Sequence, residues 1–110
     1  MGSVNGIFWT NLHPTDKLFF MIGVTETVNL LKLQSDKAPA VEAFPSTMNN
    51  GQLVAAFDEF YSDKRNLRIP TTFVPVWIAL KAVAPALADS EATKMRESIA
   101  ADDAKQQMKR

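Results

Sequence analysis

Residues 50–61, NGQLVAAFDEFY, carry the clearest structural pattern in the chain. Four large apolar side chains of this stretch follow one another at i, i+4, i+7 and i+8: Leu53, Phe57, Phe60 and Tyr61. This spacing places them on one face of an α-helix, while the polar side chains point elsewhere. Asparagine is a favoured residue at a helix N-cap. The stretch therefore predicts an amphipathic helix that begins at a cap formed by Asn49 or Asn50.

Two helices are predicted before this one. Residues 5–12 form a short helix that ends ahead of Pro14, because the residue before a proline avoids the helical region. Residues 14 to about 33 form a longer helix, since their apolar side chains recur at helical spacing over too great a length for a strand. Gly23 inside this helix indicates the close approach of a neighbouring helix. Residues 34–47 predict a loop with one turn of helix at residues 41–44.

Two further helices are predicted after it. The polar residues 63–68 connect to a helix whose stripe includes Phe73, Trp77 and Leu80, with Pro75 in its first turn, where proline is tolerated. Asp89 or Ser90 can cap a last helix that continues to about residue 107. The apolar stripe of that helix is thin: Ala92, Met95 and Ile99.

The predicted architecture is an all-α fold, a single small bundle of four to five helices. Residues 1–88 make up the helical core domain, and residues 89–110 a polar C-terminal helix or tail of the same domain. The side chains expected to share one core are spread over three helices: Phe20, Val24, Val28, Phe57, Phe60, Trp77 and Leu80.

Composition excludes several classes of function. The 110 residues contain 12 Lys and Arg against 12 Asp and Glu, so the chain lacks the basic surplus of a nucleic-acid-binding protein. The longest apolar run, residues 18–24, is far short of the roughly 20 residues of a membrane span. Cysteine is absent, which excludes disulfides, thiolate metal sites and a cysteine nucleophile.

Catalytic and metal-binding constellations are also missing from the sequence. His13 is the only histidine, so no histidine pair can hold a metal, and no glycine-rich phosphate loop is present. We therefore expect no cofactor and no enzymatic activity. One acid stands out: Glu26 shares a helical face with Phe19, Ile22 and Leu30, and should lie partly among apolar side chains. It is either a site acid or a boundary residue paired with Arg65, Arg68 or Lys81.

Candidate protein-binding residues lie in the charged turn, which we define as residues 63–68. Recognition residues concentrate in loops held between rigid helices, and this turn offers five polar ones: Asp63, Lys64, Arg65, Asn66 and Arg68. Trp9 is a further candidate, with a core position as the equal alternative. Phe8, Trp9 or residues 95–99 could bury their apolar surface in a homodimer. The alternative is a monomer whose C-terminal helix folds back on the bundle.

The chain also resembles a bacterial family. The resemblance rests on Gly51-Gln52-Leu53, on Tyr61 near the helix end, on the turn that leads into residues 66–70, and on Ala79-Leu80. These features are similar to the small helical type VI secretion immunity proteins of the Rap/Tai group. Residues 6–9 and Gly23-Val24-Thr25-Glu26 fit the same pattern, although the usual cysteine pair is missing.

The resemblance implies an all-helical, dimeric protein that blocks a peptidoglycan amidase. It also implies a periplasmic location if a leader has been removed; otherwise a cytoplasmic one is expected. The sequence as a whole favours a non-catalytic protein-interaction domain, with the immunity role as its specific form. The alternative is a small-ligand-binding or hydrolase-like protein with a polar site around Glu26.

Overall fold

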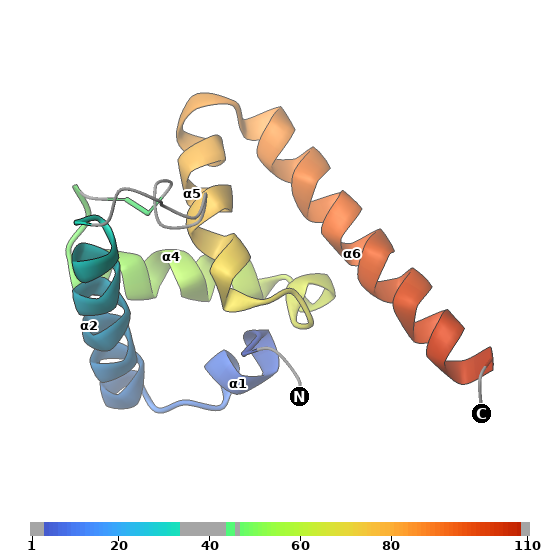
Figure 1. Ribbon diagram of the computed structural model, residues 1–110, viewed down its shortest axis with the longest axis horizontal. Helices are drawn as coiled ribbons and strands as arrows, with labels where there is room; N and C mark the ends of the chain where they lie inside the picture. Colours follow the sequence, from blue (N-terminus) through green and yellow to red (C-terminus); the bar gives the residue numbers. More distant parts are fainter. Residues whose placement is uncertain (1–3, 34–43, 46, 109–110) are drawn as a thin grey trace.

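The computed structural model describes residues 4–33, 44–45 and 47–108, and within them the chain is helical (Figure 1). The described residues contain five α-helices and two 3₁₀ turns, and no strand beyond an isolated bridge between Asn5 and Pro70. The elements follow one another in this order: α1 (Gly6–Thr10), α2 (Pro14–Leu31), α4 (Asn50–Ser62), η1 (Lys64–Asn66), η2 (Thr71–Phe73), α5 (Val74–Val83) and α6 (Pro85–Met108). The prediction of a small all-α bundle is confirmed. The helical turn predicted at residues 41–44 lies outside the described residues, apart from Phe44, which is buried.

Helix α4 is the centre of the fold, because α1, α2 and α5 all pack against it. Asn49 is the cap: its side chain accepts a hydrogen bond from the backbone N–H of Gln52 (2.8 Å), and the Gln52 side chain accepts one from the backbone N–H of Asn49 (2.9 Å). This reciprocal pair is a capping box, which fixes where the helix begins. The predicted apolar stripe is buried as expected: Leu53, Phe57, Phe60 and Tyr61.

Helix α1 is short but tightly attached to α4. Trp9 is fully buried, with its ring centroid 5.0 Å from that of Phe57, and its indole N–H donates to the Asp58 carboxylate at 2.8 Å. Gly6 allows the close approach, because a Cβ at this position would lie 2.3 Å from an atom of the Tyr61 ring. Of the two alternatives for Trp9, the core position is therefore the one observed, and its side chain offers no exposed surface to a partner.

Helix α2 packs against α4 through its buried residues Met21 and Val28, while the opposite face is exposed. Phe19 exposes 66% of its surface on that side, and Glu26 is exposed as well, so the prediction of a partly buried acid is wrong. The prediction for Gly23 is also wrong, because a Cβ added there would meet nothing within 4 Å. Helix α2 is apolar on several sides, and tertiary packing decides which of them is buried.

The boundary between α5 and α6 differs from the prediction. Pro75 lies in the first turn of α5, as expected. Helix α5 ends at Val83, and α6 begins at Pro85, so the predicted start at Asp89 or Ser90 is wrong. Proline is favoured at the first position of a helix, where its missing N–H costs nothing, and one proline here separates two consecutive helices.

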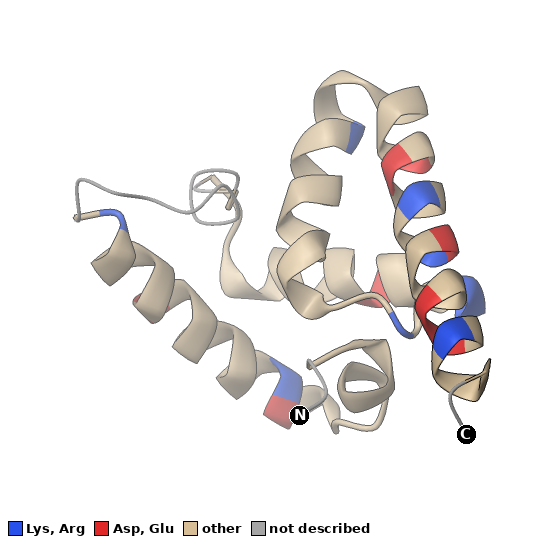
Figure 2. Ribbon diagram, turned by 45° about the vertical axis from the view of Figure 1, so that its right-hand side comes forward, with Lys and Arg blue, Asp and Glu red and all other residues tan. Residues whose placement is uncertain are grey.

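Helix α6 turns back along α5 and passes η1 (Figure 1). Ala88 and Ala92 are buried, and Met95 and Ile99 are half-buried against the core. The thin apolar stripe of α6 thus packs against the core of its own chain. This is the arrangement in which the C-terminal helix folds back on the bundle, and it leaves little of the stripe exposed to a second copy. Figure 2 shows acidic and basic residues distributed along α6.

The predicted core is confirmed in its centre and incomplete at its edges. Val28, Phe57 and Phe60 are buried in one cluster, and Phe20, Val24 and Trp77 are half-buried against it. Leu80 is half-buried and lies outside this cluster. The other buried members of the cluster complete it from every part of the described chain: Trp9, Met21, Phe44, Leu53, Tyr61, Ile69, Val74 and Ala92.

Candidate functional site

The charged turn begins where α4 ends, at Asp63. The Asp63 carboxylate caps η1 by accepting a hydrogen bond from the backbone N–H of Arg65 at 3.0 Å. It also accepts two from the Arg65 side chain, from Nε at 3.0 Å and from Nη2 at 2.7 Å. These hydrogen bonds favour the ionised carboxylate and lower the pKa of Asp63 to about 2. Sequence reasoning placed both residues at the surface, and the Arg65 side chain is 72% exposed.

Asn66 has a different role from the one predicted. It is buried, with 6% of its surface exposed, and so it is not a residue that a partner can reach. Its side-chain amide donates to the Phe60 carbonyl oxygen at 2.9 Å, and its Oδ1 accepts from Nη1 of Arg96 at 2.6 Å. Buried polar groups must find such partners or lose stability. Asn66 therefore joins the turn to both α4 and α6.

The remaining backbone of the turn is fixed by neighbouring elements. The N–H of Ile7 donates to the Leu67 carbonyl at 3.2 Å, and the Tyr61 hydroxyl donates to the Ile69 carbonyl at 2.7 Å. Burial also raises the pKa of Tyr61, which keeps this hydroxyl protonated as a donor. Leu67 is half-buried against the core and anchors the turn there. The turn is an exposed surface on a fixed backbone.

The other cations of the turn remain at the surface. Lys64 is exposed, and Arg68 forms an ion pair with Asp103 on α6. Lys81, on α5, forms an ion pair with Glu59. The predicted pairing of Glu26 with Arg65, Arg68 or Lys81 is therefore wrong, because the three cations have these closer partners: Asp63, Asp103 and Glu59.

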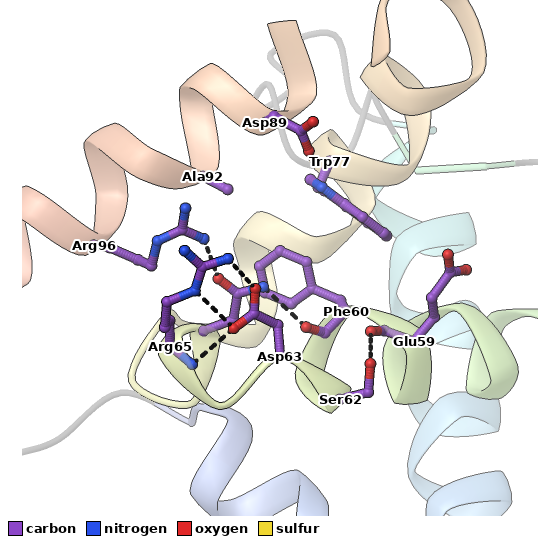
Figure 3. Close-up of a pocket in the computed structure, with 10 residues that line it drawn as sticks. Glu59, Phe60, Ser62, Asp63, Arg65, Trp77, Asp89, Ala92 and Arg96 are labelled. Atoms are coloured by element: carbon purple, nitrogen blue, oxygen red, sulfur yellow. Dashed lines mark hydrogen bonds and ion pairs between the residues drawn. The ribbon is translucent and has the colours of Figure 1, made fainter. Parts of the chain in front are cut away.

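A polar pocket of about 480 Å³ adjoins the turn (Figure 3). Its walls come from the end of α4, from η1, from Trp77 on α5 and from Asp89, Ala92 and Arg96 on α6. We call this hollow the polar pocket. Figure 3 shows the guanidinium groups of Arg65 and Arg96 together at one end, and the Asp89 carboxylate beside the Trp77 ring at the other. The two ends of the pocket thus carry opposite charges.

Arg96 is the residue of this site that the sequence did not reveal. Its guanidinium donates to Asn66 Oδ1 and, through Nη2, to the Thr93 hydroxyl at 2.9 Å. Both acceptors are neutral, so the charge of Arg96 is oriented without being neutralised by a carboxylate. The contact joins Asn66 in the turn to Arg96, which lies 30 positions further along the chain. Arg96 belongs to α6, a helix whose apolar stripe is thin. No local signal identifies it.

Two acids of the pocket, Glu59 and Asp63, and its hydroxyl group have structural partners. The Ser62 hydroxyl donates to the Glu59 backbone carbonyl at 2.6 Å rather than to a general base.

Among the described residues, no group of three His, Cys, Asp or Glu side chains could hold a metal ion. His13 stands at the N-cap of α2, and its side chain makes no capping hydrogen bond. In the same described part, no helix has the length and apolar character needed to cross a membrane.

Comparison of the chain with protein-family models, curated proteins and solved structures found no match. Function must therefore be argued from the site itself.

Proposed function

We propose that this chain is a non-catalytic protein-interaction domain, and that it contacts its partner through the charged turn and the polar pocket. The observation that carries the proposal is the combination of exposed cations and a fixed backbone at residues 63–68. Arg65 exposes 72% of its side chain and Arg68 exposes 56%, while the buried Asn66 holds the turn in place. A surface that is ordered before binding loses less conformational entropy when a partner docks.

Charge indicates the kind of partner surface. The turn carries three cations, of which Arg65 is paired with Asp63 and Arg68 with Asp103 of α6, so one positive charge, that of Lys64, is left over. An acidic surface would complement it, and such complementarity mainly increases the rate of association and the specificity. Arginine is enriched among the residues that dominate binding energy at interfaces.

The chemistry of the pocket supports binding rather than catalysis. The Asp63 carboxylate, with its pKa lowered to about 2, is a weak proton acceptor at neutral pH. Glu59 is paired with Lys81, and the Ser62 hydroxyl is committed to a backbone carbonyl. Nucleophilic catalysis needs a hydroxyl within reach of a base, and these side chains are oriented for other contacts.

The specific form of the proposal is an immunity protein that binds a peptidoglycan-amidase effector in the periplasm. It rests on the resemblance of residues 51–53, 61–70 and 79–80 to the Rap/Tai group, and the all-helical fold agrees with it. The rival function, a small-ligand or hydrolase-like site around Glu26, loses its main support because Glu26 is exposed on α2. The polar pocket is lined instead by residues of α4, η1, α5 and α6.

The homodimer stays a prediction, with a changed surface. Trp9 is buried and residues 95–99 contribute to packing within the chain. Phe8 on α1 is 42% exposed, and Phe19 and Leu30 on α2 are each 66% exposed. We infer that any self-association uses these exposed apolar side chains, Phe8 on α1 together with Phe19 and Leu30 on the face of α2 that points away from the core.

Capture of a partner by the purified chain, followed by measured affinities, tests the proposal. An Arg65→Ala, Arg68→Ala double variant should weaken binding by about tenfold or more, because two of the three exposed cations of the turn are removed. Lys94→Ala, which removes an exposed cation from α6, is the matched control and should bind as the parent does. Parent affinity in the double variant would exclude the charged turn as the contact surface.

The immunity form needs its own assay. Where a peptidoglycan-amidase gene adjoins the gene of this chain, the purified chain is mixed with that amidase, and release of peptidoglycan fragments is followed. Equimolar chain should suppress the release, and the double variant should restore it. An amidase that remains fully active with excess chain would exclude the immunity role and leave the interaction domain to be tested by capture.

A further inference from the structure

We propose that the polar pocket receives a dipolar element of the partner, with a carboxylate bound at Arg96 and a cationic group bound at Asp89. The chain between these two groups would lie on Ala92 and Trp77. This inference rests on the proposed function, because it specifies the chemistry that the partner presents to the same site. It is carried by the geometry of the two ends of the pocket (Figure 3).

The anion-binding end is built around an oriented guanidinium. Arg96 uses Nη1 for Asn66 Oδ1 and Nη2 for Thr93 Oγ1, and a guanidinium has five N–H donors, so further donors remain for a ligand. Asn66, which holds Arg96, is buried with 6% of its surface exposed, and its hydrogen bond to the Phe60 carbonyl fixes its orientation. Arg65 lies beside Arg96. Of these two guanidinium groups, that of Arg65 forms an ion pair with Asp63, which leaves the positive charge of Arg96 for a ligand carboxylate.

The cation-binding end is formed by Asp89 and Trp77. In the described part of the chain, the Asp89 carboxylate forms no ion pair, whereas the nearby Glu59 is compensated by Lys81. Figure 3 shows the Asp89 carboxylate beside the Trp77 ring. That ring already attracts one ammonium group, since Lys81 Nζ lies 4.7 Å from its centroid. A ligand cation would meet the Asp89 carboxylate and the Trp77 ring, and the charge of Lys81 beside that ring is compensated by Glu59.

The spacing of the two ends limits the size of the ligand. Asp89 and Arg96 lie on one helix, two turns apart, so their backbones are separated by about 10 Å along the axis. Ligand atoms stand about 3 Å from the protein groups that bind them, so the two ligand charges should be separated by roughly 4 Å if the side chains of Asp89 and Arg96 run parallel, and by more if they diverge. A flexible lysine side chain can place its ammonium at such distances from its own carboxylate. Nα-acetyl-lysine is therefore a suitable probe.

The test is a titration of the full ¹⁵N-labelled chain, followed through the Trp77 indole N–H and the amides of residues 63–68. Nα-acetyl-lysine should bind with a dissociation constant on the order of 1 mM, the expectation for a ligand of about thirteen non-hydrogen atoms. Nα-acetyl-norleucine keeps only the carboxylate and Nα-acetyl-lysinamide keeps only the cation. Each should bind about fivefold more weakly or worse. Equal binding of the three probes, or no shift in any of these signals, would overturn the inference.

Two substitutions assign the ends of the pocket. Arg96→Gln should reduce the affinity for Nα-acetyl-lysine to that for Nα-acetyl-lysinamide, and Asp89→Asn should reduce it to that for Nα-acetyl-norleucine. The matched controls Lys94→Gln and Glu97→Gln change exposed charges on α6 outside the pocket and should leave the affinity unchanged. Asp89 is exposed and forms no ion pair with another described residue, so its variant should fold and tests the inference even if Arg96→Gln unfolds. Unchanged affinity in Asp89→Asn would reject the cation-binding end.

Competition separates this inference from the function on which it rests. Nα-acetyl-lysine at about 20 mM should release a captured partner if a partner group occupies the pocket. If the partner stays bound and still depends on Arg65 and Arg68, the pocket inference fails and the interaction domain stands. If the probe binds as expected but no partner depends on the turn, the proposed function fails, and the pocket is a site for a free zwitterion.

Discussion

Replacing Asn66 with alanine removes the side chain that joins the charged turn to two helices. The variant loses the hydrogen bond to the Phe60 carbonyl (2.9 Å) and the one from Arg96 (2.6 Å). A neutral hydrogen bond contributes about 1 kcal/mol to stability, and one to a charged group about 1.5–3 kcal/mol. The Phe60 carbonyl is left without this donor in a buried setting. We therefore expect the free energy of unfolding to fall by about 2–4 kcal/mol.

Urea denaturation measures this loss. For a slope of about 2 kcal/mol per molar urea, the middle of the usual range, the midpoint should fall by about 1–2 M. Asn11→Ala is the matched control: Asn11 also donates to a backbone carbonyl, that of Ile7 at 2.8 Å, but it does so at the exposed end of α1. Its loss should be below about 1 kcal/mol.

A double-mutant cycle apportions the effect. Asn66→Ala and Arg96→Gln are each measured alone and then together, and the two should show a coupling energy of about 1–2 kcal/mol, because the residues touch. Additive losses would show that the Arg96 contact contributes nothing to stability. A total loss below about 0.5 kcal/mol in Asn66→Ala would refute the account of the turn as a surface held by a buried amide.

Four further outcomes are expected. Gly6→Ala should lose about 1–3 kcal/mol of stability because its Cβ would overlap an aromatic ring of α4, whereas Gly23→Ala, in open space within α2, should gain about 0.5–1 kcal/mol; thermal unfolding of the two variants compares them directly. The folded-state pKa of Asp63 is lowered, so the contribution of its carboxylate to the free energy of unfolding is present above pH 4 and is lost as the pH falls through about 2. Urea unfolding across this range should show Asp63→Asn less stable than the parent above pH 4, by less than about 1 kcal/mol because the ion pair is exposed. The two proteins should become equally stable as the pH falls through about 2. Glu26→Gln should change stability by less than about 0.5 kcal/mol and leave partner affinity unchanged, and a tenfold loss of affinity would bring back a site at Glu26. Light scattering at micromolar concentration should give a dimer mass for the parent and a monomer mass for Phe19→Ser, and a monomeric parent would remove the dimer.

The parts of the fold that could be predicted are those with a local cause. The α4 stripe and its asparagine cap are written in consecutive residues, and both Asn49 and Phe57 behave as their positions indicate. The start of α6 could not be read in the same way. Pro85 fits a helix end and a helix beginning equally well, and only the packing of Ala88 and Ala92 against the rest of the chain selects the second.

The error at Glu26 has a comparable origin. Helix α2 carries large apolar side chains on both of its long faces, so periodicity alone offers two directions for the core. Contact with α4 selects the face of Met21 and Val28, and Glu26 is left exposed with Phe19. Local spacing defines a face but does not say which neighbour covers it.

The candidate site shows where sequence reasoning ends. The sequence identifies residues 63–68 as a charged connection. Which of them supports the turn and which is exposed depends on Arg96, which contacts the turn from α6, 30 residues further along the chain. That contact makes Asn66 a buried support and leaves Arg65 and Arg68 at the surface. Stability and recognition are therefore separable in this turn. Variants of the support should change both folding and binding, whereas variants of the exposed arginines should change binding alone, because surface ion pairs contribute little to stability.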